Sequence, residues 1–492
     1  MKTATIKIFS FCFLIATAVC SCSKVNDFGN INQNPSATTT PIPSALLTNT
    51  LSQLGNDTWD AAVTNSTGLT TVCGFYCQYF SETLYTELST YARPNINWDN
   101  YYAGRLYDLQ IIINYNTDPE TAAKAADYGS NNNQVAVARI MKVYLFSLLT
   151  DCYGDLPYSA ALTGNNGINA FDKQENIYKD FFKELSEASA QFDQGNPPLG
   201  DILFKGDVHK WKQFANSLHA LLALRLSKVD TELGKAEFNA ALTAEEGVFE
   251  SGENAELIYE GSGYYNPVYN YHLGAILRLG VSATLTNWLT QKNDNRILAY
   301  ASNATGFPYG ISKSAVDSFN NVQSNWAKVL HGSATPSGAP FPLLTAAEVY
   351  LARAEAAFRK WTNENVVGMY AQGIKESWQY WGVYNDSAYA SYILQPAVVV
   401  ANTGTDNLQR ICEQQWAAQY PNGPRGFSNW RRTGYPDLVP GPASIAPAIP
   451  RRFPYGNNTY GTNPNNTNEA AERYMVNGEK DSQWGRVWWD EQ

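Results

Sequence analysis

Histidine is scarce in this chain, with four among 492 residues. The sequence also lacks the His-Glu-x-x-His motif of zinc proteases, the Gly-x-Ser-x-Gly turn of serine hydrolases and the phosphate-binding Gly-x-x-x-x-Gly-Lys-Ser/Thr loop. Glycoside hydrolysis needs only two carboxylates, so Asp151 and Asp155 are the first pair to consider. Asp151 closes a predicted helix and Asp155 belongs to a turn sequence, in which Asp accepts backbone N–H bonds. We therefore predict structural roles for both, no catalytic residue and no enzymatic activity.

Blocks of basic residues are missing as well. The chain has 35 Lys and Arg against 45 Asp and Glu, which gives a formal net charge of −10. Nucleic-acid binding depends on clustered cations that neutralise phosphates. The composition therefore argues against a nucleic-acid partner.

Cysteines are too few for a fold built on disulfides in a chain of this length, with seven in total. Cys73 and Cys77 are four residues apart and share a face if the segment is helical. The sequence does not decide whether these two cysteines form a disulfide. No nearby His or second Cys pair completes a zinc set, so we expect no metal and no other cofactor.

The N-terminal apolar run, Ile8 to Val19, is shorter than the roughly 20 residues that span a bilayer. Lys2 and Lys7 precede it and Ser21-Cys22 follow, which is the order of a secretory signal peptide that ends in a lipobox. We predict that residues 1–21 are the signal peptide.

Cys22 is then the predicted lipid-bearing N-terminus, with palmitate among its acyl chains. Several acyl chains on one cysteine hold a protein firmly to a membrane surface. Residues 22–43 contain Gly29, Pro35, Pro41 and Pro43 among Asn, Thr and Ser. This composition predicts an irregular tether between the anchor and the folded domain.

Aromatic residues are abundant, with 31 Tyr, 21 Phe and 13 Trp. Most belong in a core, because aromatic rings bury large areas. Tyrosine at this frequency in an exported protein also suits a surface that stacks on sugars.

Hydrophobic periodicity predicts helices on both sides of a less regular middle segment. Thr345 and Glu348 form a capping box, and the alanines after it permit close approach of a second helix. We predict a single domain from 44 to 492, with a helical scaffold over about 44–250 and 341–420, a loop-rich insertion over about 251–340 and an irregular tail over 421–492. The predicted helices are Val135 to Leu149, Gln174 to Ala190, Trp211 to Val229, the one opened by Thr345, Val366 to Trp381 and Asn407 to Tyr420.

Several sequence segments occur along this chain in the same order as in the members of a known family. They are the lipobox with Asn32-Gln33-Asn34-Pro35, Thr150 to Tyr158, Trp211 to Leu218, Val349 to Phe358, Trp430 to Pro436 and Arg486 to Asp490. In these segments the chain resembles the SusD/RagB family of bacterial surface lipoproteins, especially its SusD-like branch.

The resemblance implies a mainly α fold, in which tetratricopeptide-like helix pairs support a loop-rich lobe. It also implies an outer-membrane lipoprotein that faces the cell exterior, captures oligosaccharides and hands them to a SusC-like TonB-dependent transporter. In the family, the Trp-Arg-Arg segment recurs in members of different ligand preference, so the resemblance implies that Arg431 and Arg432 join the tail to the scaffold.

Sugar capture needs flat aromatic faces together with side chains that bind hydroxyl groups. Two regions supply both, 76–102 and 263–326, and the resemblance implies that they lie near one another at the ligand face. The same scaffold could instead bind peptides or another nutrient, and a surface glycosidase is a third hypothesis. The predicted ligand-binding residues are Tyr79, Trp98, Asn100, Tyr264, Tyr265, Asn266, Tyr269 and Trp326.

Overall fold

The computed structural model describes residues 40–58, 68–163, 168–274, 276–332, 335–401, 404 and 406–491. The predicted signal peptide, the lipid-bearing Cys22 and nearly all of the predicted tether lie outside these residues. From Pro43 onward the chain folds as one compact unit.

The predicted buried helix is the centre of α6 (Asn131–Tyr153), in which apolar side chains on every side are buried. α7 (Gln174–Gln191) buries Ile177, Phe181 and Leu185 on one stripe, as its periodicity predicts. α8 (Val208–Arg225) begins three residues before the predicted start, because the Asp207 side chain caps it by accepting the Lys210 N–H.

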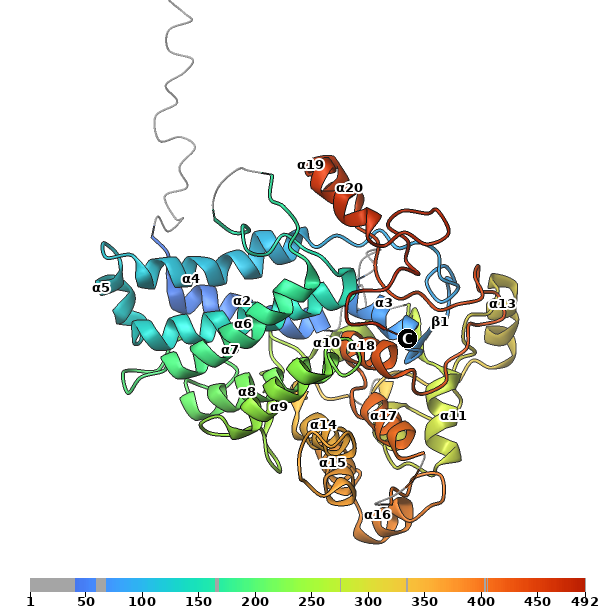
Figure 1. Ribbon diagram of the computed structural model, residues 1–492. Helices are drawn as coiled ribbons and strands as arrows, with labels where there is room; N and C mark the ends of the chain where they lie inside the picture. The colour runs from blue at the N-terminus through green and yellow to red at the C-terminus, as the bar shows by residue number, and fades with distance from the viewer. Residues whose placement is uncertain are drawn as a thin grey trace, which may run out of the picture. The chain divides into compact units, whose positions relative to one another are not determined.

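Consecutive helices form a layered stack. α2 (Pro43–Thr58) contacts α4 (Tyr107–Thr117), α4 contacts α6, and α6, α7, α8 and α9 (Thr231–Thr243) follow in the same order. Figure 1 shows this stack on the left of the molecule, from blue through cyan to green. Because each helix has one apolar stripe facing each neighbour, the stack buries a continuous core.

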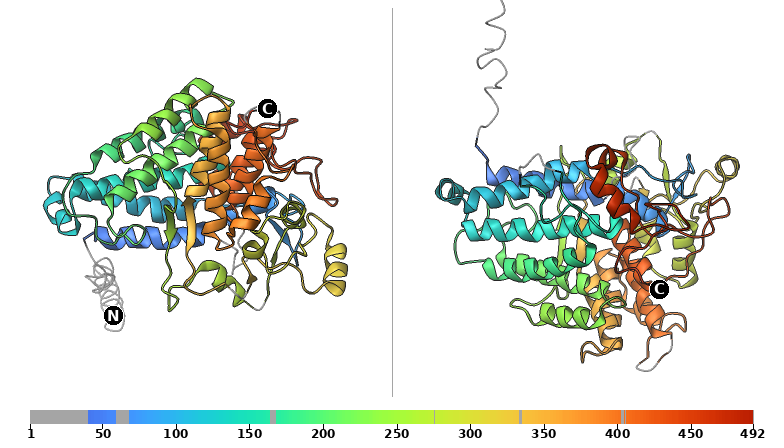
Figure 2. Two further views of the ribbon diagram at one scale, coloured as in Figure 1. Left: turned by 90° about the horizontal axis from the view of Figure 1, so that it is seen from below. Right: turned by 45° about the horizontal axis from the view of Figure 1, so that its top comes forward.

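A second group of helices packs against this stack through a contact between α14 and α8 (Figure 2). α14 (Ala346–Phe358) opens with the predicted capping box: Thr345 Oγ1 accepts the Glu348 N–H at 3.4 Å, and Glu348 Oε1 accepts the Thr345 N–H at 3.1 Å. Contacts then run from α14 to α15 (Val366–Tyr380) and α17 (Asn407–Ala418), from α17 to α18 (Gly423–Thr433), and from α18 to α3 (Leu69–Tyr76).

The pairing of α14 with α15 confirms the expected close approach of small residues. Gly373 of α15 lies at the closest point, where an added Cβ would stand 2.6 Å from Leu351 Cγ and 3.0 Å from the Leu351 backbone nitrogen. The predicted mainly α fold, with helix pairs supporting a loop-rich lobe, is therefore confirmed.

Strands are short, and those in the described ranges form two antiparallel pairs. β1 (Phe80–Glu82) pairs with β3 (Leu279–Val281), and β2 (Asn254–Leu257) pairs with β4 (Phe341–Thr345). The remaining elements are η3 (Tyr101–Leu106), α5 (Ala122–Ala125), η4 (Ala126–Tyr128), α10 (Pro267–His272), α11 (Ala283–Gln291), α12 (Ile297–Tyr300), α13 (Lys313–Val322), α16 (Asp386–Ile393), α19 (Asn457–Thr462) and α20 (Pro464–Glu472).

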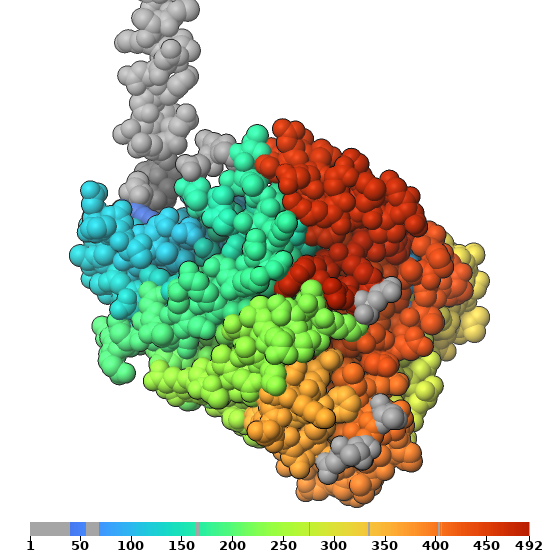
Figure 3. Space-filling model, viewed as in Figure 1, coloured from blue at the N-terminus to red at the C-terminus, as the bar shows by residue number. Residues whose placement is uncertain are grey.

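The segment predicted as an irregular tail contains three helices joined by longer non-helical stretches. α18, α19 and α20 all lie in it, and Figure 3 shows its red surface beside the teal segment that follows α6. Asn463 Nδ2 donates to the Asn169 carbonyl at 2.6 Å, and the Tyr455 hydroxyl donates to the Asp155 carbonyl at 3.0 Å. The tail is therefore part of the scaffold surface.

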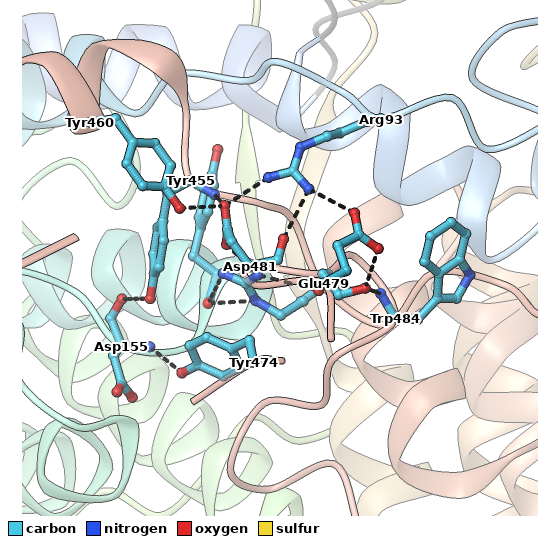
Figure 4. Close-up of polar contacts among 11 residues, drawn as sticks. Arg93, Asp155, Tyr455, Tyr460, Tyr474, Glu479, Asp481 and Trp484 are labelled. Atoms are coloured by element: carbon cyan, nitrogen blue, oxygen red, sulfur yellow. Dashed lines mark hydrogen bonds and ion pairs between the residues drawn. The ribbon is translucent and has the colours of Figure 1, made fainter. Parts of the chain in front are cut away.

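A buried carboxylate, Asp481, holds this tail together (Figure 4). Its Oδ1 accepts from Arg452 Nη1 at 2.6 Å. Its Oδ2 accepts from Arg93 Nη2 at 2.8 Å, the Tyr455 N–H at 2.9 Å and the Tyr460 hydroxyl at 3.1 Å. Four donors satisfy the charge, which explains how Arg452 and Asp481 can both be buried.

Candidate functional site

The two aromatic regions predicted for ligand binding meet at the β1–β3 ladder. Phe80 lies opposite Val281 and Glu82 lies opposite Leu279. The Thr83 N–H then donates to the Arg278 carbonyl at 3.0 Å, which extends the contact by one residue. The expectation that these distant parts of the chain are neighbours is confirmed.

Tyr85 and Arg278 lie together just beyond this ladder. Tyr85 is 47% exposed, and the Arg278 guanidinium lies 5.2 Å from its ring centroid. Leu273 and Ile276, in the connection between α10 and β3, are 64% and 59% exposed. We call Tyr85, Arg278, Leu273 and Ile276 the ladder surface. Exposed large apolar side chains are a feature of binding surfaces, and here two of them precede Arg278 in the chain.

A pair of tyrosines lies at the start of α10, before this connection. Tyr265 and Tyr269 are half-buried, with ring centroids 5.6 Å apart and an interplanar angle of 39°. Asn266 fixes their backbone because its Oδ1 accepts the N–H groups of Val268 at 2.8 Å and Tyr269 at 3.3 Å, which caps α10. The segment from 265 to 278 therefore carries the pair and three of the four residues of the ladder surface, and Tyr85 comes from the segment after β1.

Asn266 itself is 2% exposed, and its Nδ2 donates to the Ala339 carbonyl at 2.9 Å. All its polar atoms serve the cap and this loop contact. Its predicted role in binding ligand is therefore corrected to a positioning role for Tyr265 and Tyr269.

Tyr79 and Trp98 are core residues, which corrects their prediction as ligand contacts. Tyr79 has no exposed surface, its ring centroid lies 5.2 Å from that of Trp416, and its hydroxyl donates to the Trp416 carbonyl. Trp98 is 6% exposed and packs edge-on against Tyr153 and Tyr455. A ring covered by protein has no face left for a sugar.

Trp326 is corrected in the same way, since it is also 6% exposed. The Lys328 ammonium lies 3.4 Å from its ring centroid, Phe307 packs against it, and its Nε1 donates to Asn320 Oδ1 at 3.2 Å. The cation and the hydrogen bond hold the indole within a small core cluster.

Tyr264 is half-buried in a structural contact, whereas Asn100 is exposed. The Tyr264 ring packs on Tyr259 at 4.6 Å, and its hydroxyl donates to the Ser52 carbonyl of α2 at 2.9 Å, so this residue joins the lobe to the scaffold. Burial raises its pKa above the usual value of 10.0. Asn100 is exposed at the start of η3.

Sequence reasoning missed Arg278, Leu273 and Ile276. Alternation in Leu277-Arg278-Leu279 is a weak strand signal that puts Arg278 on the opposite face from two leucines. Exposure of Leu273 and Ile276 depends on how the connection runs between α10 and β3, which the sequence does not reveal.

The two carboxylates considered for catalysis are both buried, and both accept hydrogen bonds from other parts of the protein. Asp151 accepts from the Tyr178 hydroxyl, from Trp489 Nε1 at 3.0 Å and from Arg225 Nε at 3.4 Å. It therefore has the structural role predicted for it.

Both carboxylate oxygens of Asp155 also accept hydrogen bonds from the protein. Its Oδ1 accepts the Gln174 N–H at the start of α7 at 2.8 Å, and its Oδ2 accepts from Arg473 of the tail. Figure 4 shows it beside Tyr455 and Tyr474. It joins α7 to the C-terminal segment, as turn chemistry predicts for an Asp in this position.

Arg431 and Arg432 join the tail to the scaffold, as expected. Arg431 Nη2 donates to the Asp151 carbonyl at 2.6 Å, and its guanidinium lies 4.7 Å from the Trp489 ring centroid. Arg432 Nη2 donates to Glu355 Oε2 of α14 at 2.7 Å. Both arginines are 1% exposed, so neither offers an anion site at the surface.

The cysteines of the described ranges are free. Cys73 lies beside Cys152, with the two sulfurs 3.5 Å apart, and the Cys77 thiol is directed to the carbonyl oxygens of Gly74 and Gly423. Burial raises the pKa of Cys73 and Cys77 well above the usual value of 9.0. The described part of the chain contains no cluster of three His, Cys, Asp or Glu side chains that could hold a metal ion.

Among the helices that the structure describes, none combines the length and the apolar character needed to cross a bilayer.

Comparisons with known proteins show which family has this architecture. A family of SusD-like proteins, described as starch-binding associating with outer membrane, matches residues 33–456. No curated protein matches the sequence.

Three solved structures show the extent of the likeness. A chitin-binding protein is 26% identical with a TM-score of 0.75, and a SusD-like protein of Bacteroidetes AC2a is 25% identical with the same TM-score; each match covers 92% of this chain and 100% of the other. A chitin-binding SusD homolog from Flavobacterium johnsoniae is 23% identical with a TM-score of 0.74, over 90% of this chain and 98% of the other. Since the family match extends over most of its length, this chain belongs to the SusD-like family of starch-binding proteins that associate with the outer membrane.

Proposed function

We propose that this protein captures oligosaccharides at the outer face of the outer membrane and passes them to a SusC-like TonB-dependent transporter without chemical change. The observation that carries the proposal is the ladder surface together with the Tyr265–Tyr269 pair, on a chain of this family. Tyr85 is an exposed ring beside the Arg278 cation, and Tyr265 and Tyr269 are half-buried rings on the segment that leads to Arg278.

Such a surface suits carbohydrate for chemical reasons. The apolar C–H face of a pyranose packs on an aromatic ring, and its hydroxyl groups accept and donate hydrogen bonds. Tyr85 supplies an exposed ring, Arg278 supplies donors beside it, and Asn270 of α10 is an exposed amide. A solved relative with 26% identity is named as chitin-binding, which makes N-acetylglucosamine oligomers the first probes.

The expected affinity is modest. A surface that is open to water and offers few aromatic contacts should bind with a Kd between micromolar and millimolar, or about −8 to −4 kcal/mol. Weak binding also suits the proposed transfer, because the ligand must leave the surface for the transporter.

Membrane attachment and partnership complete the proposal. Acyl chains on Cys22 anchor the mature chain, residues 22–43 act as its tether, and the folded domain covers the transporter. Replacing Cys22 with Ser should move the protein from the membrane fraction to the soluble fraction and abolish palmitate labelling. Co-purification of a TonB-dependent transporter with the wild-type protein tests the partnership.

Calorimetry on a chain that begins at Ser23 tests the binding role. The titrants are chitohexaose, a panel of other neutral hexaoses and a peptide mixture. We expect heat with one glycan, no product by chromatography, and about two- to thirteenfold weaker binding for Tyr85→Ala and for Tyr269→Ala, because stacking contributes about 0.5–1.5 kcal/mol beyond area burial.

Tyr384→Ala is the matched control, because Lys375 lies 5.4 Å from the Tyr384 ring centroid in a similar cation–ring contact away from the ladder. Equal affinity of all three variants and the wild type would place binding elsewhere. Heat with peptides and none with glycans would favour a peptide-binding role on the same scaffold. Sugar products that disappear in a carboxylate variant would establish a glycosidase.

A further inference from the structure

A polar groove lies on the helical scaffold, and it shares no residue with the ladder surface or the tyrosine pair. Its volume is about 410 Å³, within the roughly 300–1,000 Å³ typical of small-molecule sites. α4, α6 and α7 lie side by side (Figure 1). Residues of these helices and of the segment 158–163 line the groove. Three helices and one loop segment therefore form the groove.

Tyr158 is the partly exposed aromatic residue among those that line this groove, and Phe146, which is 1% exposed, packs behind it. Phe146 of α6 and Tyr158 pack edge to face, with ring centroids 4.8 Å apart. The Tyr158 hydroxyl donates to Asp180 Oδ2 of α7 at 2.7 Å, which fixes the ring position. Tyr158 is half-buried, so part of it faces the groove.

The polar walls are already ordered by their own contacts. Lys142 Nζ donates to Gln110 Oε1 at 2.6 Å, and Gln110 Nε2 donates to Asn114 Oδ1 at 2.8 Å. Arg139 makes a two-bond ion pair with Glu184, at 2.9 and 3.0 Å. Lys142 has three N–H donors, of which Gln110 takes one.

The charges that line the groove cancel. Arg139 and Lys142 are balanced by Asp180 and Glu184, and all four line the same space. A strongly charged ligand would therefore meet a like charge as well as an opposite one. An apolar ligand would remove water from these polar groups without replacing their hydrogen bonds. A neutral ligand with many hydroxyl groups and an apolar face meets both the partly exposed Tyr158 ring and the polar walls.

We propose that this groove is a second carbohydrate-binding site, which takes a neutral oligosaccharide independently of the ladder surface. The inference rests on the proposed capture function, because it assigns a further site for the same class of ligand. Two weak sites on one chain would increase retention of a long glycan, since binding at one raises the local concentration at the other.

The test blocks the groove by adding bulk and keeps Tyr158 and the four charged residues that line it. Ala161 lines the groove, whereas Ala160 is an exposed neighbour that does not line it. Ala161→Trp should fill the space, and Ala160→Trp is the matched control. Asn114→Arg, at an exposed position on the opposite wall, is a second blocking variant if Ala161→Trp melts below the wild type.

Calorimetry with chitohexaose and the panel of neutral hexaoses measures the number of sites per chain. We expect two sites in the wild type and in Ala160→Trp, and one site in Ala161→Trp. The double variant Tyr85→Ala, Tyr269→Ala should keep one site, and combining it with Ala161→Trp should abolish binding.

The failures of the two proposals give different results. One site in the wild type that is removed by the double variant and unchanged by Ala161→Trp would overturn the groove site and leave the capture function standing. No binding heat from the wild type with any of the hexaoses would overturn both the groove site and the capture function. Loss of the second site in Ala160→Trp as well would show that the segment, and not the groove, is responsible.

Discussion

Glu355 shows how this chain keeps a charge in its core. The carboxylate has no exposed surface and accepts from Arg432, Arg359 and Gln415, with the Arg359 Nε bond at 2.8 Å. Burial alone would raise its pKa, but the charges of Arg432 and Arg359 outweigh it and hold the pKa well below the usual value of 4.5. The residue therefore stays ionised while it joins α14 to α18.

Glu355→Gln should lower the free energy of unfolding by about 3–5 kcal/mol at pH 7, because it leaves Arg432 buried without a counter-charge. A lowered folded-state pKa means that this carboxylate stabilises the protein fully above pH 4.5, and that the contribution is lost as the pH falls from there through the folded-state value. Urea unfolding at pH 7 and pH 4 should show a smaller loss with acid in the variant than in the wild type.

Asp317→Asn is the control for that experiment, because Asp317 pairs with Lys313 at the surface, where both side chains are more than half exposed. Exposed pairs contribute about 0–1 kcal/mol. Equal effects of the two substitutions would contradict the role given to Glu355.

At the scale of elements, close approach between α14 and α15 depends on one glycine. Gly373 faces Leu351 with no room for a methyl group, whereas Gly368, one and a half turns earlier on α15, is exposed and meets only its own capping residue. The same substitution therefore has opposite effects at two positions of one helix.

Gly373→Ala should lower the free energy of unfolding by about 1–3 kcal/mol through overpacking. Gly368→Ala should raise it by up to about 1 kcal/mol, because alanine favours the helix over glycine. Thermal and urea unfolding of both variants measure this difference in sign. Stabilisation by both would mean that α14 and α15 pack less closely than the structure has them.

Elements differ in how far the sequence foretold them. α6, α7, α14 and α15 follow from periodicity and a capping box, which are local signals. α18 was missed because it begins with Gly423 and Pro424 and buries arginines instead of an apolar stripe. Pro is tolerated in the first helical turn, but burial of Arg431 and Arg432 depends on partners in distant helices.

The sequence predicted which regions form the candidate site but not which of their aromatic residues are exposed. The two regions were placed together correctly, yet Tyr79, Trp98 and Trp326 are core residues. Their burial is decided by long-range partners, such as Trp416 at 337 positions from Tyr79, which accepts the Tyr79 hydroxyl bond. In a chain with this many aromatic rings, composition cannot separate those that pack from those that face solvent.

At the scale of the whole molecule, the boundary of the folded unit lies at Pro43. α2 begins there and buries Leu47, Leu51 and Leu54 against the scaffold. Thr48 Oγ1 also donates to the Gly200 carbonyl at 2.8 Å, and Ser52 accepts the Tyr264 hydroxyl bond. α2 therefore connects the start of the domain to the loop-rich lobe.

A chain that begins at Thr40 should melt within about 1 °C of one that begins at Ser23, since terminal residues outside a packed unit add little stability. A chain that begins at Gly68 lacks α2, and burial of three leucines contributes about 1.5–3 kcal/mol each, a large part of the roughly 5–15 kcal/mol that stabilises a folded protein. We expect this shorter chain to be unfolded or insoluble by circular dichroism and gel filtration. A lower melting temperature on removing residues 23–39 alone would contradict the tether assignment, because it would show that these residues pack against the domain.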